Sequence, residues 1–421
     1  MHISLVGLNH STTPVTIREK VAISVEQLHD SLSLLRHYVS YGIILSTCNR
    51  TEVYTTDSDA LHAEEASINF LESRSNIPDA KLRRHTYVHK DEAAVEHLFR
   101  VACGLDSMIV GEFEVLGQVG QALQLAEKAR MVNLPLRHVF QSAIRTGRKV
   151  RGETGISKNA LSVSSVAVDL AARVVSDLKN CKMLVIGAGE AGRLVVKMAK
   201  ERGASRIVVA SRTQERASAL AATLGGIPIG LNNLIDELST ANIVVTCTGA
   251  PHCILDFRRV QEAIRTRPEL PLVIIDIAVP RDVEPAVGQI NNVFLYNIDD
   301  FTEISDLNRK QREGEIQKAM EIIAAELGKF VSWWRALEVR PIVSALVRKA
   351  EDIRRTQLNK TLKKLRPLSD AERDSLEAMT KSIVTKILKD PIYCVKANAS
   401  NNRDYAEMVS ELFQLNREKQ E

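Results

Sequence analysis

Short apolar runs and longer segments with helical spacing succeed one another in the first 150 residues. Residues 3–8 and 42–47 have the composition of buried strands, and residues 51–56 follow with a period of two. The segment between the first two runs places four apolar residues at helical intervals: Val25, Leu28, Leu32 and Leu35. From Asp91 to about residue 150 the periodicity is helical throughout. This order predicts an α/β unit followed by a helical layer.

The pattern between residues 182 and 298 is different. Five short and strongly apolar runs occur there: 183–189, 206–211, 241–249, 271–278 and 293–298. Runs of this kind are typical of parallel strands that are covered by helices on both faces. The segments that follow the first two runs have helical spacing and end in glycine, as helix C-termini often do. We therefore expect a doubly wound (Rossmann) sheet.

From residue 302 onward the chain has helical character, with a narrow apolar seam. The seam repeats at alternating steps of four and three residues and ends at Pro341: Ile316, Met320, Ile323, Leu327, Phe330, Trp334 and Leu337. Such a seam needs a partner helix, either in its own chain or in a second copy. We expect three domains: an α/β domain over 1–155, a Rossmann domain over 156–300 and an all-helical dimerisation domain over 301–421.

Composition and charge narrow the class of protein. The 421 residues are 45% hydrophobic and 26% charged, which is typical of a soluble globular chain. A net charge of +4 tolerates a nucleic-acid partner without requiring one. No apolar run approaches the roughly 20 residues needed to cross a bilayer, and the first ten residues resemble a strand more than a signal peptide. Six cysteines without a CxxC pair indicate reduced thiols and a cytoplasmic location, with no metal site expected.

The strongest local motif is Gly187-Ala188-Gly189-Glu190-Ala191-Gly192, between an apolar strand and a helical segment. In a dinucleotide site the three glycines allow a tight turn, close approach of the backbone to the pyrophosphate, and close packing of helix on strand. The helix N-terminus supplies unpaired N–H groups to the phosphates. The alternative is a glycine-rich turn without a ligand.

The end of the second strand indicates which dinucleotide is bound. NAD-binding proteins place an acidic residue there, whereas this chain has Ser211-Arg212-Thr213. Arg212 suits a 2′-phosphate, and the two hydroxyls can donate hydrogen bonds to it. The expected cofactor is NADPH, unless Arg212 only covers the edge of the sheet.

A cysteine closes the second apolar run of the chain. Cys48 lies in Thr47-Cys48-Asn49-Arg50, where Arg50 could stabilise a thiolate and the polar neighbours could bind an acyl group. On these grounds alone, a small apolar cysteine that closes a strand is the stronger interpretation. His97 lies beside the apolar stripe of a helix, a position typical of a solvated or internally satisfied histidine.

Four phrases, at residues 7–19, 46–54, 97–119 and 275–285, together resemble the glutamyl-tRNA reductase family. The resemblance extends in register over the first 300 residues, and the helical C-terminus is similar to that family's dimerisation domain. It implies that Cys48 is a nucleophile, that Thr47, Asn49 and Arg50 recognise the substrate, and that His97 is needed for activity.

Further pocket positions implied by the resemblance are Ser107, Glu112, Phe113, Glu114 and Gln118. The family commonly has Pro-Gln where this chain has Phe113-Glu114. A carboxylate at 114 in place of an amide changes the hydrogen bonds that this position can make.

The implied activity is reduction of glutamyl-tRNA(Glu) by NADPH to glutamate-1-semialdehyde, through a thioester on Cys48. The implied partners are a second copy of the chain and glutamate-1-semialdehyde aminotransferase. Two other classes stay open. One is an NADPH dehydrogenase of the shikimate dehydrogenase type, in which a Lys/Asp pair transfers protons, and the other is an inactive tRNA-binding relative.

Overall fold

The computed structural model describes residues 1–75, 77–158, 161–175, 177–366, 368–398 and 403–415. The chain divides into two compact units, Met1–Glu326 and Leu327–Glu421. The first unit contains two sheets, so the three-domain division at residues 155 and 300 stays a prediction. Within the described ranges, no helix combines the length and apolar character needed to cross a membrane.

The N-terminal sheet has four antiparallel strands in the order β2-β3-β1-β4. Their bounds are β1 His2–Asn9, β2 Gly42–Ser46, β3 Arg50–Asp57 and β4 Tyr87–Lys90. The first three confirm the predicted strands. The fourth has four half-buried residues and no apolar alternation, which is why the sequence pattern missed it.

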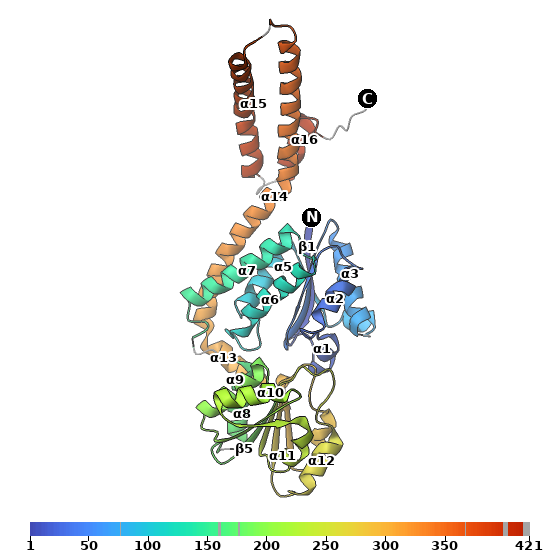
Figure 1. Cartoon of the computed structure of the whole chain (residues 1–421), viewed down its shortest axis with the longest axis vertical. Coiled ribbons are helices and arrows are strands. Elements are labelled where there is room, and N and C mark those ends of the chain that lie inside the picture. The colour runs from blue at the N-terminus through green and yellow to red at the C-terminus, as the bar shows by residue number, and fades with distance from the viewer. Residues whose placement is uncertain (76, 159–160, 176, 367, 399–402, 416–421) are drawn as a thin grey trace. The chain divides into compact units, whose positions relative to one another are not determined.

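Helices cover both faces of this sheet (Figure 1), with α2 and α3 on one side and α5, α6 and α7 on the other. The helices of this region are α1 Val15–Val21, α2 Leu28–Leu35, α3 Ala60–Ser75, α4 Asp79–Leu82, α5 Asp91–Ala102, α6 Glu114–Lys128 and α7 Leu134–Glu153. The predicted helical layer is confirmed. Helix α2 begins at Leu28, later than the spacing of the apolar residues from Val25 suggested. Val25 lies before the helix and is 59% exposed.

The second sheet is parallel, with the strand order β10-β9-β8-β5-β6-β7, and confirms the doubly wound prediction. Its strands are β5 Lys182–Ile186, β6 Arg206–Ser211, β7 Ile227–Gly230, β8 Ile243–Thr246, β9 Leu272–Asp276 and β10 Val293–Asn297. The order reverses between β5 and β8. Ligands of such sheets bind beyond the carboxyl ends of the strands at this reversal.

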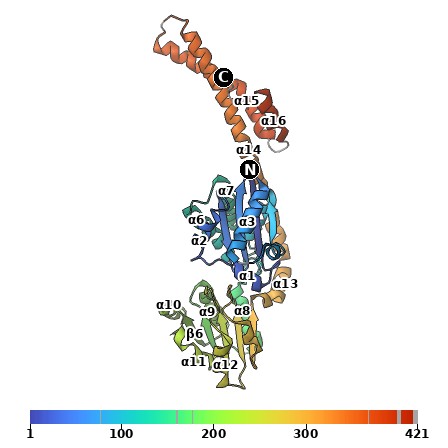
Figure 2. The ribbon, with the colours of Figure 1, turned by 90° about the vertical axis from the view of Figure 1, so that its right-hand side faces the viewer.

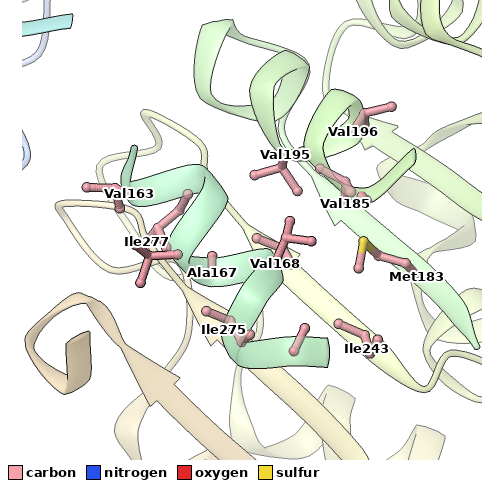
Figure 3. Packing of buried hydrophobic residues seen from close by; sticks show 14 of the residues in the cluster. Val163, Ala167, Val168, Met183, Val185, Val195, Val196, Ile243, Ile275 and Ile277 are labelled. Carbon is pink, nitrogen blue, oxygen red and sulfur yellow. The ribbon is translucent and has the colours of Figure 1, made fainter. Parts of the chain in front are cut away.

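Alternate residues of each strand pack into two separate cores. Val185 faces α8 (Val163–Val175), α9 (Glu190–Glu201) and α10 (Gln214–Leu224), as Figure 3 shows in part. The neighbouring Leu184 faces α11 (Leu234–Leu238) and α12 (Phe257–Arg265) on the opposite side. Strands buried on both faces account for the unbroken apolar runs of the sequence.

The C-terminal region is helical, as predicted. It consists of α13 Thr302–Gln311, α14 Glu313–Leu362, α15 Asp370–Asn398 and α16 Arg403–Leu412, with α16 beside α15 (Figure 2). Helix α14 continues through Pro341, although a proline inside a helix removes one backbone hydrogen bond. The seam is not an exposed stripe: Ile323 is 1% exposed in the single chain, and Leu327 and Phe330 are also buried. Packing within the chain, one of the two alternatives that the sequence left open, thus accounts for these three residues.

Candidate active site

Cys48 lies at the tip of the hairpin between β2 and β3. The Thr47 N–H donates to the Arg50 carbonyl over 2.8 Å. The Thr47 hydroxyl accepts hydrogen bonds from the N–H groups of Asn49 and Arg50, at 3.1 and 3.2 Å. The three predicted recognition residues Thr47, Asn49 and Arg50 thus form a tight turn that presents the half-buried cysteine.

The surroundings of the cysteine hold its thiol in the neutral form. Burial raises the pKa of Cys48 to about 12, with further increases from Glu112 and Glu114, while Arg18 acts in the opposite direction. Arg50 was expected to stabilise the thiolate, but its guanidinium is bound to two carboxylates instead. The sequence analysis did not identify Arg18, whose role depends on a contact across 30 residues.

Arg50 is fully enclosed and has two acidic partners. Its Nη1 donates to Oε1 of Glu52 over 2.7 Å and to Oδ2 of Asp106 over 3.2 Å. Glu52 has no exposed surface, whereas Asp106 is partly exposed. Any anionic group that binds Arg50 must therefore compete with Asp106 rather than with Glu52.

Glu52 is the centre of a buried hydrogen-bond network that also includes His97. Besides Arg50, its carboxylate accepts from the hydroxyls of Tyr54 and Tyr87, each at 2.6 Å, and lies 2.8 Å from Nε2 of His97. Burial acts to raise the pKa of Glu52, but Arg50 and His97 hold it well below its usual range. His97 is thus a satisfied side chain, as its helical stripe indicated, and its partner connects it to Arg50.

A sequence signal for Glu52 existed. Arg50, Glu52 and Tyr54 occupy alternate positions of one strand and therefore share a face of the sheet. Opposite charges at alternate positions of one strand can form an ion pair on that face of the sheet. The sequence analysis read these residues only as a strand.

Two carboxylates, Glu112 and Glu114, act electrostatically on Cys48, and a third, Glu190, acts on Glu114. Burial raises the pKa of Glu112, and the Ser107 hydroxyl and Arg50 oppose that increase. Burial, Glu112 and Glu190 together raise the pKa of Glu114 to about 7. Since Glu190 begins the helix after the glycine loop, this cluster connects the cysteine region to the predicted cofactor loop.

Two other predicted positions lie apart from this cluster. Phe113 is 58% exposed, and the Arg151 guanidinium carbon lies 5.3 Å from its ring centre. Gln118 is half-buried one turn into α6. Among the described contacts, none connects either residue to Cys48.

Unused polar atoms also lie near the cysteine. Within the described ranges, Oδ1 of Asn49 and Nδ1 of His10 are buried without a hydrogen-bond partner. The backbone N–H of His10 donates to the Asn49 carbonyl over 2.9 Å, which fixes the two residues side by side. Burial, Arg50 and Arg18 lower the pKa of His10 to about 4, so its imidazole is neutral at physiological pH. Buried polar atoms without partners are unusual in proteins and suit a ligand.

A pocket of about 250 Å³ lies at the carboxyl ends of β5, β6 and β8. Its lining includes Gly187, Ala188, Gly189 and the segment Ser211–Thr213, so the two parts of the predicted dinucleotide site do converge. Glu190, Ala191 and Gly192 form the first turn of α9 instead. Lining residues that the sequence did not indicate include Arg216, in the first turn of α10, and Thr248 and His252, in the loop after β8.

The glycine loop fits a pyrophosphate. Gly187 has a φ of +124°, and a Cβ there would lie 2.8 Å from the Cys247 carbonyl oxygen. A Cβ at Gly192 would collide with the Gly187 carbonyl, whereas Gly189 faces open space at the N-terminus of α9. Gly187 thus allows the tight turn, Gly192 the close packing of helix on strand, and Gly189 the close approach to a pyrophosphate that the motif requires.

Family models match most of the chain. The model for the glutamyl-tRNAGlu reductase N-terminal domain matches residues 6–154, and the model for shikimate/quinate 5-dehydrogenase matches residues 169–304. The model for the glutamyl-tRNAGlu reductase dimerisation domain matches residues 318–415.

Full-length relatives agree with these matches. The glutamyl-tRNA reductase of Moorella thermoacetica is 41% identical over 420 residues, which cover 99% of this chain and 95% of the relative. That of Natranaerobius thermophilus is 38% identical over 421 residues, with coverages of 99% and 92%. The solved glutamyl-tRNA reductase of Methanopyrus kandleri is 33% identical, covers 98% of each chain and gives a TM-score of 0.51. These similarities confirm the resemblance drawn from the four sequence phrases, and the chain belongs to the glutamyl-tRNA reductase family.

Proposed function

We propose that this chain reduces glutamyl-tRNA(Glu) to glutamate-1-semialdehyde with NADPH through a Cys48 thioester, in the first step of five-carbon tetrapyrrole synthesis. The observation that carries the proposal is the position of Cys48, on a rigid hairpin tip beside unpartnered polar atoms and a carboxylate cluster that reaches the glycine loop. Family membership supports the same activity.

The reaction has two stages at one sulfur atom. The Cys48 thiolate attacks the ester carbonyl, the bond to the ribose oxygen breaks, and that oxygen leaves with a proton as the tRNA hydroxyl. NADPH, when bound, supplies the hydride that reduces the thioester. The resulting thiohemiacetal loses its carbon–sulfur bond, which releases the aldehyde and regenerates the thiolate.

A neutral thiol must first lose its proton, and the substrate can assist. Glu112 and Glu114 both raise the pKa of Cys48. The α-ammonium group of a glutamyl ester is complementary to these carboxylates. Once bound, it neutralises the charges that disfavour the thiolate, and Glu114, whose own pKa is about 7, suits the role of proton acceptor.

The remaining site residues have distinct proposed roles. Arg50 binds the γ-carboxylate of the glutamyl group by replacing Asp106, while Glu52 and His97 keep its guanidinium in place. Asn49, whose buried Oδ1 has no hydrogen-bond partner, accepts a hydrogen bond from the bound glutamyl group, and the Ser107 hydroxyl donates one to it. Other pocket positions are assigned by family resemblance alone: Thr47, Phe113 and Gln118.

NADPH is the proposed cofactor. The loop Gly187–Gly192 holds the pyrophosphate, and Ser211, Arg212 and Thr213 hold the 2′-phosphate. The absence of an acidic residue at the end of β6 supports the phosphorylated dinucleotide, because a carboxylate there would repel the phosphate.

A homodimer is proposed through the C-terminal unit. An apolar groove of about 590 Å³ lies between α14 and α15. Several large apolar residues on its walls are exposed in the single chain, namely Ile353, Met379, Ile383 and Ile387. A surface of this kind is typical of an interface, and the dimerisation-domain match covers it.

The product is a reactive aldehyde, so we also propose direct transfer to glutamate-1-semialdehyde aminotransferase, and a cytoplasmic location for both proteins. Co-sedimentation of the two proteins and cell fractionation test these two points.

A direct assay tests the function. Purified chain, glutamyl-tRNA(Glu) and NADPH should give NADPH oxidation and aldehyde formation. A shikimate-type dehydrogenase would instead oxidise or reduce small hydroxy acids and ignore the charged tRNA. An inactive relative would bind the tRNA without either change.

A further inference from the structure

One arginine connects the cysteine hairpin to the cofactor domain. Arg18, on α1, is 2% exposed and uses all of its nitrogen atoms. Its Nε donates to the Thr13 carbonyl over 3.1 Å, and its Nη1 donates to the Cys48 carbonyl over 2.7 Å. Its Nη2 forms an ion pair with Asp299. A single side chain thus joins three segments that are distant in sequence.

Asp299 holds the other end of this connection. It lies in the 3-10 turn Ile298–Phe301, which directly follows β10, the last strand of the cofactor sheet. Its Oδ2 accepts a hydrogen bond from the Val15 N–H over 2.8 Å, at the first residue of α1. The Asn297 side chain caps the turn and accepts from the Asp299 N–H over 2.8 Å. The carboxylate is therefore fixed in place and binds α1 at two points.

A second ion pair joins the next residue of α1 to the same domain. Both carboxylate oxygens of Glu19 accept hydrogen bonds from Arg281, at 2.9 and 2.7 Å. Arg281 lies in the loop after β9. Two consecutive residues of α1 thus form ion pairs with the cofactor domain: Arg18 with Asp299, and Glu19 with Arg281. Because the two pairs have opposite polarity, they favour one orientation of α1.

We propose that Arg18 and Asp299, supported by Glu19 and Arg281, are positioning residues that set the Cys48 hairpin relative to the cofactor domain for hydride transfer. This inference rests on the proposed thioester function. Among the described hydrogen bonds and ion pairs, none joins these four residues to the sulfur of Cys48, and Arg18 binds the carbonyl oxygen of Cys48 rather than its thiol. Acyl transfer needs only the hairpin and the substrate, whereas reduction also needs the cofactor domain to be aligned with the Cys48 hairpin.

The test measures the two stages separately in the full-length chain. Discharge of glutamyl-tRNA without NADPH reports acyl transfer followed by hydrolysis of the thioester, and single-turnover NADPH oxidation reports reduction. Asp299→Asn should slow reduction by about tenfold or more, since small errors in alignment reduce rates steeply. Discharge and the alkylation rate of Cys48 should change by less than about twofold, because neither needs the cofactor domain in register.

If Asp299→Asn does not fold, reversing the charges of the Glu19–Arg281 pair tests the same proposal. Glu19→Arg alone should slow reduction as Asp299→Asn does, and adding Arg281→Glu should restore it to within about threefold, because opposite charges again face each other. Asp169→Asn is the matched control, since it breaks an Arg–Asp pair with Arg202 inside the cofactor domain. It should leave both rates unchanged.

Three results would overturn the inference: equal losses of discharge and reduction in the variants, no loss of reduction, or no recovery on charge reversal. If the wild-type chain failed to discharge glutamyl-tRNA at all, the proposed function would fail instead, and the two failures are therefore distinguishable.

Discussion

Replacing Glu114 by glutamine should make Cys48 more reactive in the free enzyme. Burial raises the pKa of the Cys48 thiol to about 12, and Glu112 and Glu114 add to that increase. With its own pKa of about 7, Glu114 is ionised above neutral pH. Two unit charges about 8 Å apart interact by about 2 kcal/mol at an effective dielectric constant of about 20. Removing such a charge lowers a thiol pKa by about 1.5 units.

The lower pKa increases the thiolate fraction at pH 8 about thirtyfold, and the weaker nucleophilicity of the more acidic thiolate reduces the gain to about five- to tenfold. The assay is iodoacetamide alkylation of the peptide that contains Cys48, followed by mass spectrometry between pH 7 and 10. Glu127→Gln, at the far end of the same helix, should have no effect. An unchanged or slower alkylation in Glu114→Gln would refute the electrostatic reasoning.

Three further predictions concern the cofactor, the buried network and the dimer. Arg212→Leu should weaken NADPH binding by about 1.5–3 kcal/mol with little effect on NADH; equal losses in titrations of both would show that Arg212 is structural. Glu52→Gln should destabilise the chain by about 3–5 kcal/mol in urea denaturation, because it leaves Arg50 with Asp106 as its acidic partner. Glu64→Gln, which breaks the partly exposed pair with Lys90, should cost at most about 1 kcal/mol, and similar costs for the two variants would contradict the role of the buried network. Truncation after Glu326 should give a monomer in sedimentation that still binds NADPH, and a truncated chain that stayed dimeric would place the interface elsewhere.

Features encoded within a few neighbouring residues could be predicted from the sequence. The glycine loop and Ser211–Thr213 converge on one pocket as expected, because each follows a strand of one parallel sheet. The hairpin position of Cys48 also follows from local pattern. Four phrases were enough to identify the family, since their order and spacing carry more information than any single motif.

Features that depend on distant contacts could not be predicted. Arg50 appeared to be the natural partner of the thiolate, two residues away, but Asp106 and Glu52 hold it elsewhere. The cation that does lower the pKa of Cys48 is Arg18, which reaches it only in the folded chain. The same limit explains the apolar seam, because periodicity shows that Ile323 is buried but not which surface buries it.

The central claim is that a thioester forms on Cys48, and trapping that intermediate tests it most directly. The full-length chain is mixed with glutamyl-tRNA(Glu) labelled in its glutamyl group, without NADPH, and is quenched in acid within the first turnover. A thioester on Cys48 should give label on the Cys48 peptide alone, which is lost on treatment with hydroxylamine and on addition of NADPH before the quench. No label is expected in Cys48→Ala. Label on another residue, or NADPH-dependent aldehyde formation by Cys48→Ala at a rate near that of the wild type, would contradict the account.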